Sequence, residues 1–221
     1  MSCGWDVIGE IGLQFFGKVT ASISHEIKNA LAIINENAGL LEDFALMAGE
    51  GKPIKPERLG ILAEKITRQI RRADGIIKNM NTFAHSVDES VKSIDVGETV
   101  EIVTLLSHRL ASMRGVSLEP TPPPRPVMIT TNPFFLMSLV WLCLDFAMDA
   151  AGAQKSVGLG AEEAENGARV RFTKLAGLKE VSLDRFPSER QRAVLNVLNA
   201  KVATNVTDGE IVITLSKDMD R

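Results

Sequence analysis

The sequence predicts an α+β protein in which a long helical hairpin precedes a unit of mixed helices and strands. In the first part of the chain, apolar residues recur at steps of three and four, the spacing of one buried helix face. Two such runs occur, one with Ile23, Ile27, Leu31, Ile34, Ala38, Leu41 and Ala45, the other with Leu59, Leu62, Ile66, Ile70, Ala73, Ile77, Met80 and Ala84. From about Ile94 the apolar segments are shorter and suit strands as well as helices. Helices packed on one face of a mixed sheet are therefore expected there.

The two long helices are expected to run from about Val7 or Glu10 to Ala48 and from Pro56 to His85. Glycines near the start of the first helix weaken it, and the segment between the helices contains helix breakers: Gly49, Gly51 and Pro53. Two amphipathic helices cannot hide both apolar stripes by themselves, so a homodimeric four-helix bundle is predicted. Residues 1–92 then form the first domain and residues 93–221 the second.

The second domain is expected to alternate strands and helices. Asn132 is placed to cap the apolar helix that opens with Pro133. A Pro-rich extended connection is expected over Thr121–Pro126. The remaining segments are two helices, Val100–Met113 and Pro187–Lys201, and strands near Val116–Leu118, Val127–Thr130, Lys155–Leu159, Ala168–Thr173 and Glu210–Ser216. This order predicts an α/β sandwich.

Composition and charge set limits on function. The chain has 221 residues, 45% hydrophobic and 24% charged, which suits one or two globular units. A net charge of −3 argues against nucleic acid as the main partner. Cys3 and Cys143 are too few and too far apart for a disulfide framework or a zinc site, and Cys143 is expected to be a buried free thiol. A reducing cytoplasm fits this usage.

The most apolar run, Phe134–Ala147, has the length of a core helix and falls short of the roughly 20 residues that cross a bilayer. Asp145 and Asp149 near its end point the same way. No basic segment leads into an apolar run at the N-terminus, so no secretory signal is expected. These observations predict a cytoplasmic protein without a membrane partner.

The segment from Ser22 to Leu31 carries the residues best suited to chemistry. His25 lies two residues from Ile23 and from Ile27, which turns it roughly 200° from the apolar stripe. It is therefore expected to face outward. Its neighbours on that face are small or polar and leave room for another protein: Ala21, Ser22, Lys28, Asn29 and Ala32.

A neutral imidazole is a competent nucleophile toward phosphorus, and a nearby carboxylate stabilises the charge that develops on the ring. Glu26 is placed to supply that carboxylate. Asn29, one turn after His25, is placed to orient a water or an acyl phosphate. The alternatives are a surface histidine without a task and a solvated amide.

The second helix has a basic face with Arg68, Arg71, Arg72 and Lys78. Such a face is either an ordinary solvated surface or a dock for an acidic partner, whose encounter it would accelerate.

His25-Glu26-Ile27-Lys28-Asn29, followed by Ala-Leu-Ala-Ile-Ile, resembles the phosphoacceptor box of two-component histidine kinases and their phosphotransfer relatives. The chain has Ala30 where that family often has proline. The resemblance implies that His25 is phosphorylated, that Glu26 acts as a base and that Asn29 places a hydrolytic water. It also implies that receiver domains of response regulators dock here, through Ser22, Lys28, Ala32, Arg68, Arg71 and Arg72, and bring the Mg²⁺.

The second domain resembles in element order the GHKL-type ATPase domain of these kinases, but the nucleotide motifs are altered. Phe146 stands where that family has the asparagine that holds Mg²⁺. Residues 174–178, Lys-Leu-Ala-Gly-Leu, replace the Asp-x-Gly-x-Gly loop. Residues 186–190, Phe-Pro-Ser-Glu-Arg, replace the glycine-rich lid, and without glycines the backbone N–H groups cannot approach phosphate closely. A degenerate domain that binds no nucleotide and no metal is expected.

These observations lead to the hypothesis of a histidine phosphotransfer protein that moves a phosphoryl group between His25 and receiver aspartates. The alternatives are a receiver phosphatase, a divergent histidine kinase that still binds ATP, and a non-catalytic scaffold.

Overall fold

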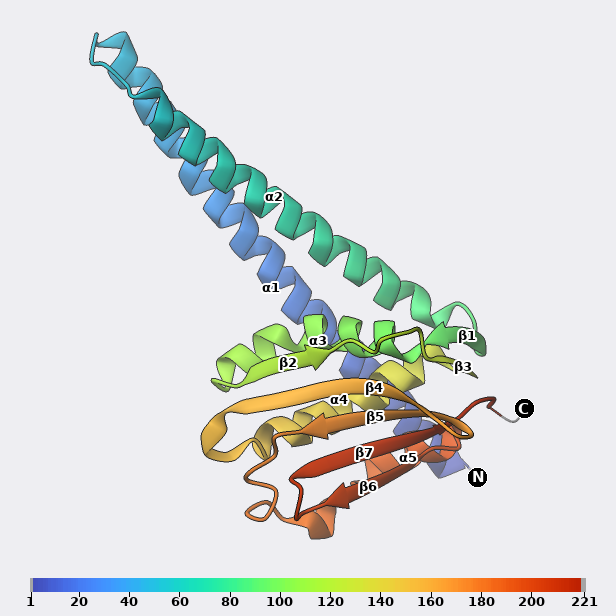
Figure 1. The fold of residues 1–221 in the computed structure, drawn as a ribbon. Helices are drawn as coiled ribbons and strands as arrows, with labels where there is room; N and C mark the ends of the chain where they lie inside the picture. The colour runs from blue at the N-terminus through green and yellow to red at the C-terminus, as the bar shows by residue number, and fades with distance from the viewer. Residues whose placement is uncertain (1, 220–221) are drawn as a thin grey trace. The chain divides into compact units, whose positions relative to one another are not determined.

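The computed structural model describes residues 2–219, with side chains placed for residues 7–184 and 186–219. It contains a helical hairpin and an α/β sheet domain, as the sequence predicts (Figure 1). The chain divides into two compact units. The hairpin unit is residues 20–82, and the sheet unit combines residues 1–19 with residues 83–221.

The hairpin consists of α1 (Ser2–Gly49) and α2 (Pro56–Ala84), joined by a short loop. Gly51 adopts a left-handed φ of 76°, which a glycine tolerates without strain, and its N–H donates to the carbonyl of Ala48. The first helix starts earlier than expected, since Gly12 does not interrupt it. A methyl group at Gly12 would lie 3.3 Å from the ring of Phe134, so the missing side chain makes room for that ring.

Three buried positions of α1 within the hairpin unit are seven residues apart, Ile23, Ala30 and Asn37, and Ser22 beside the first of them is buried as well. Such a repeat is typical of a seam between two helices. The Asn37 amide donates to the carbonyl of Ile33 at 2.6 Å, which satisfies a polar group in that seam. Other apolar residues of the two stripes stay about half exposed in the single chain: Leu31, Ile70 and Ile77.

The sheet unit is built on a five-stranded mixed sheet in the order β2-β4-β5-β7-β6. Its strands are β2 (Ser117–Thr121), β4 (Ser156–Ala164), β5 (Gly167–Thr173), β6 (Lys201–Asn205) and β7 (Glu210–Ser216). Strands β2 and β4 are parallel and the other pairs antiparallel. A separate antiparallel pair joins β1 (Lys92–Asp95) to β3 (Met128–Thr131).

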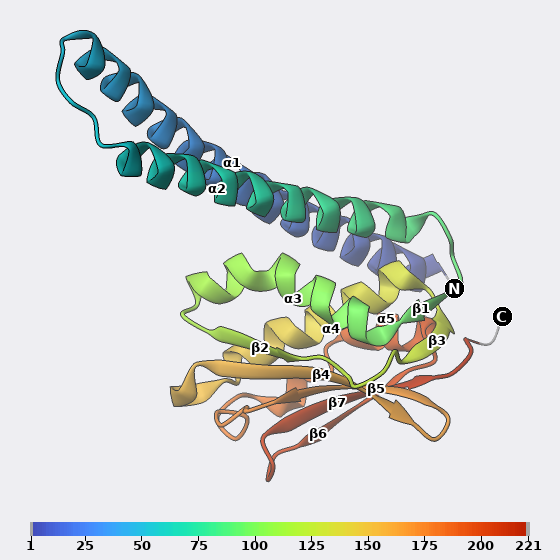
Figure 2. The same cartoon turned by 45° about the horizontal axis from the view of Figure 1, so that its top comes forward.

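Three helices cover one face of this sheet (Figure 2): α3 (Val96–Met113), α4 (Pro133–Asp149) and α5 (Glu189–Val197). Alternate residues of β5 and β7, such as Phe172 and Ile213, are fully buried, as the period of two along a strand requires. Helix α4 is apolar on nearly all sides and lies in the core. Its predicted cap is confirmed, because the Asn132 Oδ1 accepts from the N–H of Phe135 at 2.9 Å.

The run Phe134–Ala147 is a core helix, and no helix within residues 2–219 combines the length and apolarity needed to cross a membrane. Cys143 on this helix is a free, fully buried cysteine, and burial raises the pKa of its thiol. The side chain of Cys3 lies outside those described.

The last predicted helix was extended too far, since α5 ends at Val197 and residues 201–205 form strand β6. Asn199 has a left-handed φ of 48°, which stops the helix, and the N–H of Ala200 closes its end on the carbonyl of Leu195. Strands β1 and β6 were not predicted. Strand β6 is a mostly exposed edge strand, so its sequence lacks the alternation that marks a half-buried strand.

An aromatic cluster explains why the start of α1 belongs to the sheet unit. The ring of Phe15 lies 5.2 Å from that of Phe83 and 5.3 Å from that of Trp141, and Lys18 Nζ lies 4.9 Å above Trp141. Aromatic pairs at such distances add to the hydrophobic gain of burial. The compact units therefore divide at 19/20 and 82/83, whereas the predicted domain boundary lies between residues 92 and 93.

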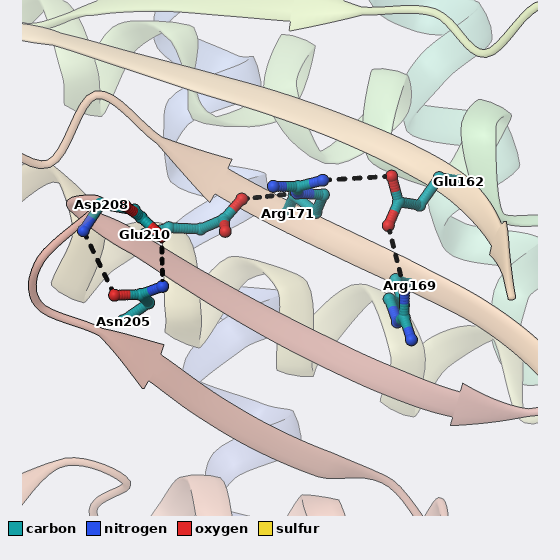
Figure 3. Close-up of polar contacts among 6 residues, drawn as sticks. All are labelled: Glu162, Arg169, Arg171, Asn205, Asp208 and Glu210. Atoms are coloured by element: carbon teal, nitrogen blue, oxygen red, sulfur yellow. Dashed lines mark hydrogen bonds and ion pairs between the residues drawn. The ribbon is translucent and has the colours of Figure 1, made fainter.

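The sheet face away from the helices carries a chain of ion pairs (Figure 3). Glu162 contacts Arg169 at 3.5 Å and Arg171 at 3.3 Å, and Arg171 Nε lies 2.5 Å from Glu210. The bond to Glu210 is the main reason that the pKa of Arg171 is raised. These charges are paired with one another and tie β4, β5 and β7 together.

Glu119 on edge strand β2 gives the sheet a pH-dependent contact. Its carboxylate accepts from the Lys174 ammonium and from the Ser156 hydroxyl, and these bonds, the first above all, hold its pKa below the ordinary value. A depressed pKa stabilises the fold above the unfolded-state pKa, and that contribution is lost as the pH falls through the folded-state pKa.

We therefore expect Glu119→Gln to lower the free energy of unfolding at about pH 7 and to have a smaller effect at about pH 3, where the unfolded-state carboxyl is protonated and part of the stabilisation is lost. Urea unfolding at the two pH values measures the difference. Glu165→Gln, at an exposed position without an ion pair within residues 2–219, is the matched control. An equal deficit of Glu119→Gln at both pH values would contradict the assignment.

Candidate functional site

His25 lies in the body of α1, where continuous helix fixes the backbone on both sides, and its side chain is exposed. The prediction that it faces outward is confirmed. Within the hairpin unit the imidazole is therefore open to a second molecule.

Asn29 contacts the ring of His25. Its Nδ2 lies 3.2 Å from His25 Nδ1, across one helical turn. With the amide N–H donating, Nδ1 carries the lone pair and the proton of the neutral ring sits on Nε2. With the amide turned over, its oxygen accepts from Nδ1–H and the lone pair moves to Nε2. The structure thus brings these two predicted residues together and couples the amide to the tautomer.

The side chain of Glu26 contacts Arg72 and not His25. Its Oε2 lies 3.3 Å from Arg72 Nη2 on the facing helix, and its side chain is only 17% exposed. No hydrogen bond joins Glu26 to His25 in the part of the chain that the structure describes. The expected base is therefore held in an ion pair between the two helices.

Among the residues expected to receive a partner, Lys28, Ala32, Arg68 and Arg71 are exposed. Neither Arg68 nor Arg71 forms an ion pair with the described residues, whereas Arg72 does. Ser22 was expected on the exposed face, and that placement is wrong, since only 6% of the residue is accessible. Both Ser22 and its neighbour Ile23 are buried, so the buried face of α1 is wider at this level than a single apolar stripe.

Sequence reasoning missed the pairing of Glu26 with Arg72. Opposite charges on two long helices indicate that a pair can form. They do not fix the register of the helices, because the turn after α1 sets which residues face each other.

The segments that depart from the nucleotide motifs pack against one another. The ring of Phe146 stacks on that of Phe186, with centroids 4.2 Å apart and planes at 21°. Asp145 is bound by Arg114, whose Nη2 lies 2.7 Å from its Oδ1. These contacts place aromatic carbon and an ion pair where the resemblance would put a metal ligand.

The loop after β5 is closed in a similar way. Leu175 and Leu178 are buried, and the N–H of Gly177 donates to the carbonyl of Ala150 at the end of α4. A Cβ on Gly152 would lie 2.7 Å from the nitrogen of Gly177, so the two backbones are in direct contact. The backbone N–H of Gly177 is thus used within the fold.

Residues 17–88 match the family model of the His Kinase A (phospho-acceptor) domain. The match covers most of α1 and all of α2, and includes His25, Glu26 and Asn29. It identifies a phosphoacceptor-type domain of histidine kinases over these residues. The phosphoacceptor domain is the part of the chain to which this finding applies.

Three solved structures are similar at low sequence identity. The histidine kinase AdeS of Acinetobacter baumannii is 12% identical with a TM-score of 0.47, over 87% of this chain and 98% of that one. The catalytic domain of histidine kinase ThkA is 9% identical with a TM-score of 0.46, over 60% of this chain and 100% of that one. The ATP binding domain of PrrB from Mycobacterium tuberculosis is 16% identical with a TM-score of 0.46, over 58% of this chain and 98% of that one. No curated protein matches the sequence.

Proposed function

We propose that this protein is a histidine phosphotransfer protein of a two-component phosphorelay, acting in the cytoplasm without binding ATP. The observation that carries the proposal is the exposed His25, held against Asn29 within a matched phosphoacceptor domain. His25 takes a phosphoryl group from the aspartyl phosphate of one receiver domain and passes it to the aspartate of another.

The chemistry is an in-line displacement at phosphorus. The lone pair of an imidazole nitrogen forms the new N–P bond, the bond between phosphorus and the aspartyl oxygen breaks, and the electron pair leaves with the carboxylate. The receiver is expected to bring Mg²⁺, so this chain supplies a positioned nucleophile and a docking surface. Asn29 holds the second ring nitrogen while the first reacts.

The surroundings of His25 support docking of an acidic partner. Lys28 beside it and Arg68 and Arg71 on α2 are exposed cations, and Ala32 adds a small side chain that leaves space. Complementary charge speeds encounter and favours the correct orientation. Ser22 is left out of this proposed surface because it is buried.

The exposed apolar residues of the hairpin support a homodimer. Leu31 is 50% exposed, Ile70 47% and Ile77 41%, so a single chain leaves these apolar side chains in contact with water. A second hairpin packed on these residues makes a four-helix bundle and removes them from water. The sheet unit then serves as a dimer-supporting or partner-binding module.

Several contacts in the sheet unit support the absence of nucleotide binding. The rings of Phe146 and Phe186 stack on each other, and the carboxylate of Asp145 is paired with Arg114. These side chains are therefore engaged within the fold and not with a nucleotide or its metal. The proposal is accordingly that this chain binds no cofactor of its own.

The contact between Asn29 and His25 favours a second candidate, a receiver phosphatase. An amide at the edge of the ring is placed to orient a water for attack on the receiver's acyl phosphate. In that case His25 would hold the partner without carrying the phosphoryl group.

The test is to incubate the purified protein with labelled ATP alone, and separately with a labelled phosphorylated receiver and Mg²⁺. Acid-labile label on His25 from the receiver only is the result expected. Label from ATP alone would restore a kinase and overturn the proposal. Faster loss of receiver phosphate without label on the protein would favour the phosphatase, and no change at all would favour a scaffold.

A further inference from the structure

Three side chains from two helices control the surroundings of His25. Asn29 Nδ2 lies 3.2 Å from His25 Nδ1, and Glu26 Oε2 lies 3.3 Å from Arg72 Nη2. For Nε2 to attack phosphorus it must carry the lone pair, so Nδ1 must carry the proton. An acceptor next to Nδ1 favours that tautomer, and a free carboxylate is a stronger acceptor than an amide oxygen.

In the structure the Glu26 carboxylate is paired with Arg72 and not with His25. Glu26 is the residue next to His25, and its Oε2 faces the Arg72 guanidinium. A guanidinium donates only, and its bond to Oε2 orients the Glu26 carboxylate toward α2 instead of toward the imidazole. Arg72 is 46% exposed, hence a partner can reach it from solvent.

We propose that Arg72 is a positioning residue that keeps Glu26 away from His25, and that an acidic partner releases Glu26 by taking Arg72 for itself. This inference rests on the proposed phosphotransfer. Once released, the Glu26 carboxylate accepts from Nδ1–H, Nε2 carries the lone pair, and the positive charge that develops on the ring during N–P bond formation is stabilised. Docking of the receiver and activation of the nucleophile are coupled through one guanidinium.

Arg71 gives a matched comparison. It is the neighbouring arginine, is exposed and forms no ion pair with the described residues. Arg71→Gln and Arg72→Gln therefore remove the same charge from the same helix, and only the second frees Glu26. A merely electrostatic role in docking would give both variants the same behaviour.

The experiment measures single-turnover transfer from a phosphorylated receiver at several receiver concentrations. Exposed ion pairs are weak, so releasing one shifts the population of free Glu26 by about two- to fivefold. We expect Arg72→Gln to raise the transfer rate at saturating receiver by that factor, and Arg71→Gln to leave that rate unchanged while raising the half-saturating concentration. In a Glu26→Gln background, Arg72→Gln should no longer raise the saturated rate. Equal saturated rates for Arg71→Gln and Arg72→Gln would overturn the inference.

A second measurement needs no receiver. ¹⁵N NMR of His25 reports which ring nitrogen carries the proton, at a pH above the imidazole pKa where the ring is neutral. Arg72→Gln should increase the share of the Nδ1–H tautomer, and Arg71→Gln should not. If the wild type accepts no phosphoryl group, the proposed function fails, while the tautomer ratio still decides whether Arg72 holds Glu26. An unchanged ratio in Arg72→Gln contradicts the inference whether or not transfer occurs.

Discussion

Replacing His25 with glutamine is expected to abolish acid-labile labelling of the protein by a phosphorylated receiver. The amide of glutamine is a poor nucleophile toward phosphorus, whereas a neutral imidazole nitrogen is a good one. Because the side chain is exposed, the substitution should leave the fold intact, as circular dichroism and the unfolding midpoint will show. The measurement is label retained at alkaline pH and lost in acid, and a fall to background is expected.

Asn29→Ala separates the two leading functions. For a phosphotransfer protein we expect transfer to be retained and hydrolysis of the receiver phosphate to be lost, because the amide orients water and does not form the N–P bond. If Asn29→Ala instead kept full hydrolysis and lost transfer, Asn29 would be needed for transfer and not for hydrolysis. A His25→Gln protein that still carries the label would show that another residue is the acceptor.

Ile70→Glu combined with Ile77→Glu is expected to convert a homodimer into monomers. Both side chains are about half exposed in the single chain and have the spacing of one helix stripe. Burying the remaining half of each contributes about 1 kcal/mol, and two-fold symmetry doubles the sum. Four such contributions correspond to roughly a thousandfold in the dissociation constant, and a buried carboxylate costs more. Light scattering after gel filtration over a range of concentrations measures the mass.

Thr82→Glu, at an exposed polar position about 140° around the same helix from Ile77, is the control for added charge and should leave the mass unchanged. If the Ile70 and Ile77 variant keeps the wild-type mass at every concentration, the stripe does not mediate assembly. A wild type that is monomeric at micromolar concentration would contradict the dimer directly.

The fold elements predicted best are those with a strong period or a definite cap. Both helix ends at the hairpin loop follow from Gly51 and Pro56, and Asn132 marks the start of α4. Strand β7 is a short apolar run between the polar residues Glu210 and Ser216, so its limits could be placed. Strand β1 was missed because it pairs with β3, which is distant in sequence, and local sequence does not report such a pairing. Strand β6 was missed because it is a mostly exposed edge strand without alternation, although its partner β7 follows it directly.

The candidate site was predicted in part. The exposure of His25 and its contact with Asn29 follow from helix geometry alone. Ser22 was misplaced because the buried face of α1 is wider at this level than one apolar stripe and includes Ser22 beside Ile23. The partner of Glu26 depends on the register of α1 against α2, which no local pattern contains.

The division of the sheet unit into two stretches of chain bears on the order of folding. Residues 1–19 and 83–221 are separated by the whole hairpin, so ordering them together requires closing a long loop. The contact between Phe15 and Phe83 lies at the base of that loop. Forming the hairpin, which uses local contacts, brings these two rings into reach and spares the sheet unit most of the closure entropy. We expect the hairpin to form first, so that the helix containing His25 also acts as the folding template for the domain that follows it.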